Sequence, residues 1–269
     1  MGYGDDLMVT GEVNELLKTR PKAKFIIGDG KKSFWSEIYY NNHSIIGAKE
    51  INDYEEIIWI NNYPHNRPYR IYDKKTNHIK YTWGKSYRVK KGQIFFSEEE
   101  ISFAKNVYEQ IKKKSLNKKI IYIEPNIKLT KGYLNRDWGF DKWQKVVNTL
   151  KNDYVFFQVS YGNQKILKNA INLHNVNFRN ACALLAKSDL YIGGHGGLSH
   201  AAAALNKKSV VIFGGWIDPL IVGYSFHTNL FIKNNESPCG AKNKCKHCIK
   251  CMNLITVKMA TKEIKYNQK

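Results

Sequence analysis

Short apolar runs alternate with amphipathic segments throughout the second half of the chain. Runs rich in β-branched residues predict strands at 120–124, 154–159, 190–192, 210–213 and 230–232. Helical spacing of apolar residues predicts helices between them at 140–150, 164–170, 179–187 and 198–205. Such alternation is typical of a parallel, doubly wound α/β sheet, whose ligands bind beyond the carboxyl ends of the strands.

The first half of the chain is less regular. Its pattern predicts a helix at 5–18 after a glycine turn, strands at 24–28 and 56–60, and a short helix at 34–40. Ser97 followed by Glu100 is a capping box, which predicts a helix that runs to about residue 114. The lysine-rich segment 112–119 is interpreted as a solvated hinge. We therefore expect two domains, 1–115 and 116–269.

A glycine-led helix is the first candidate for a binding site. The strand at 190–192 runs into glycines, and a helix of small residues follows at 198–205. Gly196 and Gly197 can take positive φ and let a ligand approach the backbone. The helix start directs unpaired N–H groups toward the same point, which suits a phosphate or diphosphate. A plain strand-to-helix turn fits these residues equally well.

Residues 193–205 also resemble the donor-site signature of glycosyltransferase family 9, the heptosyltransferase family. That signature reads Gly-x-Asp-Ser/Thr-Gly-x-x-His-x-Ala-Ala-Ala-Leu, and a Phe-Gly-x-x-Asp-Pro turn follows it. Here the turn is 213–219, which ends in Asp218 and Pro219. Two positions depart from the signature, because His195 replaces the Asp and Gly196 replaces the Ser or Thr.

The resemblance implies a GT-B fold, in which two Rossmann-like domains face each other across a cleft. It implies a glycosyltransferase that uses a nucleotide diphosphate sugar and needs no catalytic metal. Gly4-Asp5-Asp6-Leu7 resembles the family's Gly-Asp motif, which assigns the general base to Asp5. The residues alone also allow Asp5 to cap the first helix, with Asp6 as the second candidate for the base. The family's first strand is missing ahead of this motif, so either the sheet lacks a strand or the protein begins further upstream.

The resemblance also places residues around the donor. The loop at 125–143 is similar to the family's Lys-x-Trp-Pro-x-x-x-Trp loop, with Arg136 in the place of its phosphate-binding basic residue. A guanidinium can bind phosphate oxygens with two hydrogen bonds. Lys131 is a second, weaker phosphate candidate. The remaining donor-binding candidates, taken from the signature and the turn after it, are His195, Gly196, Gly197, His200 and Asp218.

Four of the five cysteines cluster near the carboxyl terminus, in a cysteine-rich loop at 238–252. They are Cys239, Cys245, Cys248 and Cys251, whereas Cys182 falls on an apolar helix face and is interpreted as core. Such clustering favours a structural metal on four thiolates, zinc ahead of iron, with His247 as a substitute ligand. Iron is retained as a candidate because some autotransporter-type heptosyltransferases similar to this family hold it on cysteines in this region.

Charge and composition add the remaining expectations. The net charge is +20, which would attract a polyanion or an anionic membrane face, although a lysine-rich surface also arises without such a partner. No apolar run is long enough to span a bilayer and no signal peptide is recognisable, which favours a cytoplasmic protein.

The acceptor is left open by the sequence. The family implies a glycan or lipopolysaccharide acceptor, and its autotransporter branch implies a protein acceptor. The strong positive charge also suits a nucleic-acid acceptor, or a non-catalytic zinc-containing protein that binds nucleic acid. The sequence is compatible with a homo-oligomer as well as with a monomer.

Overall fold

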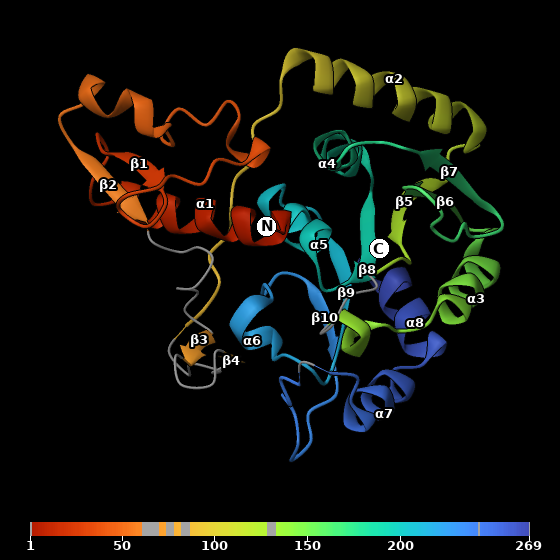
Figure 1. The fold of residues 1–269 in the computed structure, drawn as a ribbon. Coiled ribbons are helices and arrows are strands. Elements are labelled where there is room, and N and C mark those ends of the chain that lie inside the picture. The colour runs from red at the N-terminus through yellow and green to blue at the C-terminus, as the bar shows by residue number, and fades with distance from the viewer. Residues whose placement is uncertain are drawn as a thin grey trace.

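The computed structural model describes residues 2–60, 70–73, 78–81, 87–127, 133–241 and 243–268. Six parallel strands form its larger sheet, in the order β10-β9-β8-β5-β6-β7 (Figure 1). The chain runs outward from β5 to β7 and then returns to the other side of β5 at β8, so the strand order reverses between β5 and β8. The predicted doubly wound sheet is therefore confirmed. Its strands are β5 (Lys119–Glu124), β6 (Tyr154–Ser160), β7 (Ala170–His174), β8 (Leu190–Gly194), β9 (Ser209–Gly214) and β10 (Thr228–Phe231).

Helices cover both faces of this sheet because alternate strand residues point to opposite sides. Tyr122 and Phe157 belong to a core that includes α4 and α5, and it also contains the fully buried Cys182 of α4. Ile121 and Phe156 belong to a second core with α3 and α8. The helices of this half are α3 (Phe140–Leu150), α4 (Phe178–Lys187), α5 (Gly197–Ala204), α6 (Pro219–Val222), α7 (Lys246–Leu254) and α8 (Val257–Asn267), with a 3-10 turn η3 (Tyr133–Arg136).

The amino-terminal half packs onto the first of these cores. Its first helix, α1, lies beside α5 and shares the core through Leu7 and Val13 (Figure 1). β1 and β2 form a two-stranded parallel sheet, and β3 and β4 form an antiparallel pair. The predicted strands and first helix are present. These elements are α1 (Tyr3–Leu17), β1 (Lys24–Ile27), η1 (Glu37–Tyr39), η2 (Ala48–Asp53), β2 (Ile57–Ile60), β3 (Arg70–Asp73) and β4 (His78–Tyr81).

Helix α2 (Glu98–Lys114) begins with the predicted capping box, in which Ser97 accepts from the N–H of Glu100 and Glu100 accepts from the N–H of Ser97. It packs against α4. Arg179 of α4 is 4% exposed, and its guanidinium lies 2.5 Å from the Glu100 carboxylate. The same guanidinium donates to the carbonyl oxygens of Glu37 and Phe95. One buried arginine therefore ties the sheet's helical layer to α2 and to η1. The domain boundary at residue 115 stays a prediction.

One predicted helix, 164–170, is wrong. The chain there is a loop that leads into β7, an edge strand paired with β6. The side-chain oxygen of the buried Gln158 accepts from the N–H of Leu167 at 2.8 Å, and its side-chain nitrogen donates to the carbonyl of Lys165 at 3.1 Å, which ties the loop to β6. Asn169 then takes φ 64°, a left-handed conformation that a helix interior does not allow. Tertiary hydrogen bonds to Gln158 override the local helical spacing.

The cysteine-rich segment is also more ordered than a loop. Helix α7 begins after Cys245 and includes Cys248 and Cys251, and α8 follows it on the sheet. Neither helix was predicted from the sequence. None of the helices in the described part of the chain combines the length and the apolar character that a bilayer span requires.

Candidate functional site

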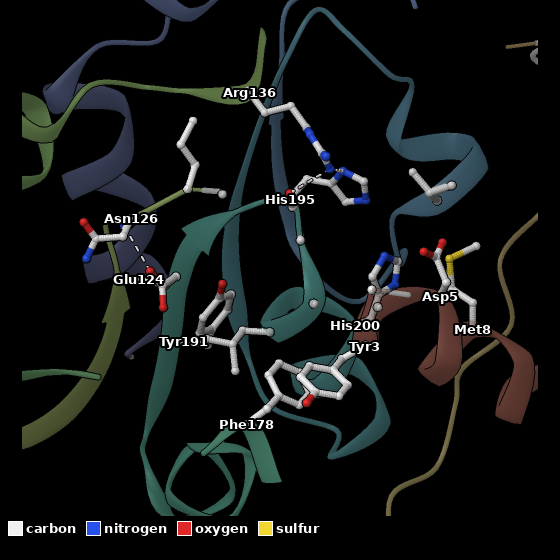
Figure 2. Close-up of a pocket in the computed structure, with 18 of the residues that line it drawn as sticks. Tyr3, Asp5, Met8, Glu124, Asn126, Arg136, Phe178, Tyr191, His195 and His200 are labelled. Carbon is white, nitrogen blue, oxygen red and sulfur yellow. Dashed lines mark hydrogen bonds between the residues drawn. The ribbon is translucent and has the colours of Figure 1, made fainter. Parts of the chain in front are cut away.

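A cavity of about 650 Å³ opens where the strand order reverses, between the carboxyl ends of β5 and β8 on one side and α1 on the other. Doubly wound sheets bind their ligands at this place. Figure 2 shows its lining, which comes from both halves of the chain. The lining residues are Gly2, Tyr3, Gly4, Asp5, Met8, Glu124, Asn126, Ile127, Arg136, Tyr161, Gln164, Phe178, Tyr191, Gly194, His195, Gly196, Gly197, Leu198, His200, Trp216, Ile217 and Val222.

Two helix amino termini meet at this cavity. Gly2 and Gly196 are the N-caps of α1 and α5, and neither glycine has a side chain that could cap its helix. A Cβ on Gly4 would lie 3.0 Å from Cδ2 of His200 and 3.3 Å from the Cα of Gly197, so glycine is needed for the two helices to approach this closely. Both positive dipole ends therefore act on the same cavity, which favours an anionic ligand.

Of the two glycines at the start of α5, only Gly197 is required by its size, and neither takes positive φ. Gly196 is extended, with φ −178° and ψ −165°, a conformation open to any residue. The expectation of positive φ at Gly196 and Gly197 is wrong, since neither residue is among the positive-φ glycines. A Cβ on Gly197 would meet the ring of Phe178 at 3.2 Å, and that ring stacks on Tyr3 at 4.3 Å between centroids. Gly197 thus makes room for an aromatic wall between α4 and α1.

Arg136 is held at the cavity by neighbours that fix its guanidinium. Its Nη1 lies 3.2 Å from both Nδ1 and the carbonyl oxygen of His195, and its guanidinium carbon lies 4.9 Å from the ring centre of Trp216. Because arginine only donates hydrogen bonds, Nδ1 of His195 is the acceptor and its proton resides on Nε2. His195 therefore orients a permanent cation at the end of β8, beside the start of α5.

Both histidines of the site are neutral. Burial lowers the pKa of His195 well below its usual range, and the charges of Arg136 and His200 lower it further. Burial, followed by the charges of His227 and Arg136, lowers the pKa of His200 to about 3. Nδ1 of His200 shares a hydrogen bond of 2.9 Å with the hydroxyl of Tyr224. The positive charge in this part of the cavity hence comes from Arg136 and from the helix termini.

The two adjacent aspartates of α1 have different surroundings. Asp5 lies in the first turn of α1 and lines the cavity, on the side opposite β5 (Figure 2). Asp6 is 2% exposed, and its Oδ2 accepts a hydrogen bond of 2.8 Å from Ser36, the N-cap of η1. Of the two, Asp5 faces the cavity, whereas Asp6 connects α1 to η1.

Sequence reasoning missed Glu124, the last residue of β5. Its carboxyl lines the cavity, and the N–H of Asn126 donates to its Oε1 at 3.0 Å (Figure 2). Burial raises its pKa to about 8, so the side chain is mostly protonated at neutral pH, while the hydrogen bond from Asn126 acts in the opposite direction. The strand-end rule could have singled this residue out, because it is the only acidic residue that directly ends a predicted strand next to the glycine-led one.

The other predicted donor residues are placed as follows. Lys131 lies outside the described residues. Asp218 is the N-cap of α6, where its carboxylate accepts from the N–H of Leu220 at 2.8 Å, and it is not among the cavity-lining residues of the described chain. Arg136, His195, Gly196, Gly197 and His200 are brought together with Asp5 in one cavity.

A second site lies at the carboxyl-terminal cysteines. Cys239, Cys245 and Cys248 gather with His247, and their ligand atoms lie within 4.8 Å of one another. Bonds of about 2.3 Å to a tetrahedral ion separate two sulfur ligands by about 3.8 Å, so this cluster fits a metal with little movement. Cysteine and histidine suit zinc and also iron. The cluster differs from the predicted four-cysteine set, because Cys251 lies outside it.

Cys251 instead packs beneath the cluster. Its Sγ lies 3.3 Å from Nε2 of His247, and a Cβ on Gly215 would meet that sulfur at 2.5 Å. Cys251 follows His247 by one turn of α7, so both face the same side of the helix. The spacing of the four cysteines is consistent with either ligand set, and only the packing of α7 distinguishes them.

The metal-site candidate is connected to the arginine of the cavity. Asn135, the neighbour of Arg136, is 1% exposed and donates to the carbonyls of Ala241 and Asn243 at 2.8 and 2.7 Å. Its Oδ1 accepts from the N–H of Cys245 at 2.8 Å. Trp216, whose ring lies beside Arg136, donates to the carbonyl of Ala241 at 2.7 Å. Movement of the cysteine-rich segment would therefore disturb the position of Arg136.

The family model for glycosyltransferase family 9 (heptosyltransferase) matches residues 70–253. The chain belongs to glycosyltransferase family 9. This family membership makes it a glycosyltransferase of the heptosyltransferase-like type, as the resemblance in the sequence implied. No curated protein matches the sequence.

Solved structures of the family share the fold. A glycosyl transferase family 9 protein from Veillonella parvula is 14% identical with a TM-score of 0.69, and the alignment covers 99% of this chain and 94% of that one. The E. coli ADP-heptose lps heptosyltransferase II is 16% identical with a TM-score of 0.63, covering 99% and 96%. The iron-containing dodecameric glycosyltransferase TibC from enterotoxigenic E. coli is 15% identical with a TM-score of 0.63, covering 100% and 74%. The fold of this family 9 chain is therefore the GT-B fold of heptosyltransferases.

Proposed function

We propose that this family 9 chain transfers a sugar from a nucleotide diphosphate sugar to an acceptor hydroxyl, with inversion and without a catalytic metal. The observation that carries the proposal is the meeting of Asp5, Arg136 and the start of α5 in one cavity. Arg136 and the start of α5 bind the diphosphate and stabilise its departure. Asp5, on the opposite side, removes the proton of the acceptor hydroxyl as it attacks the sugar.

The surroundings of Asp5 support this role over that of a helix cap. The N-cap of α1 is Gly2, and no side chain caps the helix from that position. Asp6, the second candidate for the base, is engaged with Ser36 away from the cavity lining. An acceptor that enters beside Asp5 faces the start of α5, which gives the direct displacement that inversion requires.

The acceptor belongs to the same proposal. Saccharides and lipopolysaccharide offer the hydroxyl groups that this chemistry needs, and a protein hydroxyl would serve equally. The cysteine-rich segment has a structural part in the proposal: Cys239, Cys245, Cys248 and His247 hold a metal that fixes the loop against Asn135. TibC, which has the same fold, is described as iron-containing, so both iron and zinc are candidates.

The test is turnover with a panel of ADP-, GDP-, UDP- and CDP-linked hexoses and heptoses, measured as release of the nucleoside diphosphate. With an active donor and acceptor, Asp5→Asn should keep the melting temperature and donor affinity but lose about 10²-fold or more in turnover. Asp141→Asn is the matched control, since Asp141 is an exposed acid in the first turn of α3. An active Asp5→Asn variant would remove the base assignment, and a wild-type chain that turns over no donor would contradict the proposed function.

A further inference from the structure

Four residues of the cavity lining have no part in the proposed chemistry. They are Glu124, Asn126, Tyr161 and Gln164, which lie at and just after the ends of β5 and β6. A ligand whose diphosphate lies at the start of α5 extends its nucleoside along the strand ends of the sheet. Glu124 is paired in register with Gly193 of β8, only two residues before His195. An acidic residue thus faces the path of an anionic ligand.

A carboxylate at this position would oppose binding by charge repulsion, whereas a neutral acid would assist it. Oε1 of Glu124 already accepts from the N–H of Asn126. The second oxygen has no hydrogen-bond partner among the described residues, so it is available to a ligand in the cavity. A protonated carboxyl can place its O–H on that oxygen and donate a short, strong hydrogen bond to an anionic oxygen.

We propose that Glu124 binds the donor as a neutral carboxylic acid and donates a hydrogen bond to an oxygen of the diphosphate. The inference rests on the proposed function, because it takes a nucleotide diphosphate as the occupant of the cavity. The donor then binds the form of the protein in which Glu124 carries a proton, so donor binding and proton binding are linked.

Burial supports this neutral state, and the titratable groups that face Glu124 keep a constant charge over the pH range of the proposal. Burial of the carboxyl raises its pKa to about 8. The facing groups are Tyr122 on its own strand, Tyr191 on β8, and Arg136 and His195 across the cavity. Burial raises the pKa of both tyrosines well above 10, and His195 is neutral, so none of these three changes charge between pH 7 and 9. The side-chain amide of Asn126 donates to the carbonyl oxygen of Lys165. The ammonium of Lys165 lies over the ring of Phe140, 5.4 Å from its centre.

The expected result follows from the fraction of protein that carries the proton. If only the protonated form binds, the apparent dissociation constant rises about tenfold between pH 7 and pH 9 for a group that titrates near pH 8. The Glu124→Gln side chain keeps the shape and a hydrogen-bond donor but cannot ionise. Its affinity should therefore match that of the wild type at pH 7, and at pH 9 it should stay within about twofold of its own value at pH 7. Glu99→Gln, an exposed residue at the start of α2, is the matched control and should follow the wild type.

The experiment is isothermal titration of the purified chain with ADP, GDP, UDP and CDP at pH 7, 8 and 9, in buffers of different ionisation enthalpy. At pH 8 and 9 the wild type should take up a proton as the tightest of these ligands binds, and Glu124→Gln should take up none. The same titration with inorganic pyrophosphate and with the bare nucleoside checks which group accepts from Glu124: proton uptake is expected with pyrophosphate and none with the nucleoside, and uptake with the nucleoside but not with pyrophosphate would overturn the assignment.

Two results would overturn the inference, and they are distinguishable. If the wild type binds a nucleoside diphosphate but its pH profile and proton uptake coincide with those of Glu124→Gln, Glu124 is not a neutral donor, while the proposed function stands. If no nucleoside diphosphate binds at any pH, both the inference and the proposed function fail. A folding defect in Glu124→Gln is detected by its melting temperature, and the proton uptake of the wild type alone then decides the question.

Discussion

Arg179 connects the helical layer of the sheet to the amino-terminal half, and its removal should be costly. Its guanidinium makes two contacts with the Glu100 carboxylate, at 2.5 and 2.7 Å, and donates to the carbonyls of Glu37 and Phe95. Removing one partner of a buried ion pair costs about 3–5 kcal/mol, because the other charge stays buried and unpaired. The Glu100 side chain keeps 16% exposure, so we expect the lower end, about 3 kcal/mol, for Arg179→Met.

Thermal unfolding measures this loss. At about 2–4 °C per kcal/mol for a chain of this size, Arg179→Met should lower the melting temperature by about 6–12 °C. Lys187→Met, an exposed substitution in the last turn of the same helix, should change it little. Adding Glu100→Gln to Arg179→Met should recover part of the loss, because the unpaired charge disappears. Equal melting temperatures for Arg179→Met and the Lys187→Met control would refute the reasoning.

The pH dependence of the same variants provides a second check. Burial alone would raise the pKa of Glu100, but the hydrogen bonds and charge of Arg179, together with the N–H of Ser97, lower it below its usual 4.5. A carboxyl with a lowered folded-state pKa stabilises the fold above the unfolded value, and this contribution is lost as the pH falls through the folded value. The difference between the wild type and Arg179→Met should therefore be full at pH 7 and shrink below about pH 4.5.

Two further predictions concern the cysteine-rich segment. Cys248→Ala should lower the metal content, measured by elemental analysis, from near one ion per chain, and it should destabilise the carboxyl-terminal half. The control Cys182→Ala, which changes a core cysteine outside the cluster, should keep the metal. Full metal content in Cys248→Ala would remove Cys248 from the ligand set. Asn135→Ala removes the hydrogen bonds that join the neighbour of Arg136 to the cysteine-rich segment, so it should weaken nucleoside diphosphate binding without removing the metal. Unchanged affinity in calorimetry would show that Arg136 is held independently of this segment.

The sequence predicted those elements whose local signals agree with their tertiary surroundings. The buried strand at 120–124 and the capped helix that starts after Ser97 both formed as expected. The segment 164–170 has helical spacing, but its fate depends on Gln158, a residue in another strand. In the edge strand β7, apolar and polar residues alternate from Ile171 to His174, but this period-2 signal is only four residues long and follows directly on the helical spacing of 164–170.

The candidate site divides in the same way. The resemblance to three motifs of the family pointed to Asp5, Arg136 and His195, and the structure places all three in one cavity. The neutral state of His195 and the raised pKa of Glu124 come from burial by residues far away in the sequence, which no local pattern encodes. Similarly, the choice between His247 and Cys251 near the metal-site candidate depends on how α7 packs against Gly215.

The most direct test of the central claim, that this cavity holds the diphosphate of a nucleotide, is the calorimetric affinity of Arg136→Ala for a nucleoside diphosphate and for the matching nucleoside. Charge-assisted hydrogen bonds contribute about 1.5–3 kcal/mol each, so the variant should bind the diphosphate about 10- to 100-fold more weakly and the nucleoside within about twofold of the wild type. Arg20→Ala, an exposed arginine paired with Glu56, should leave both affinities unchanged. An equal loss for the nucleoside and the nucleoside diphosphate, or no loss for either, would contradict the account.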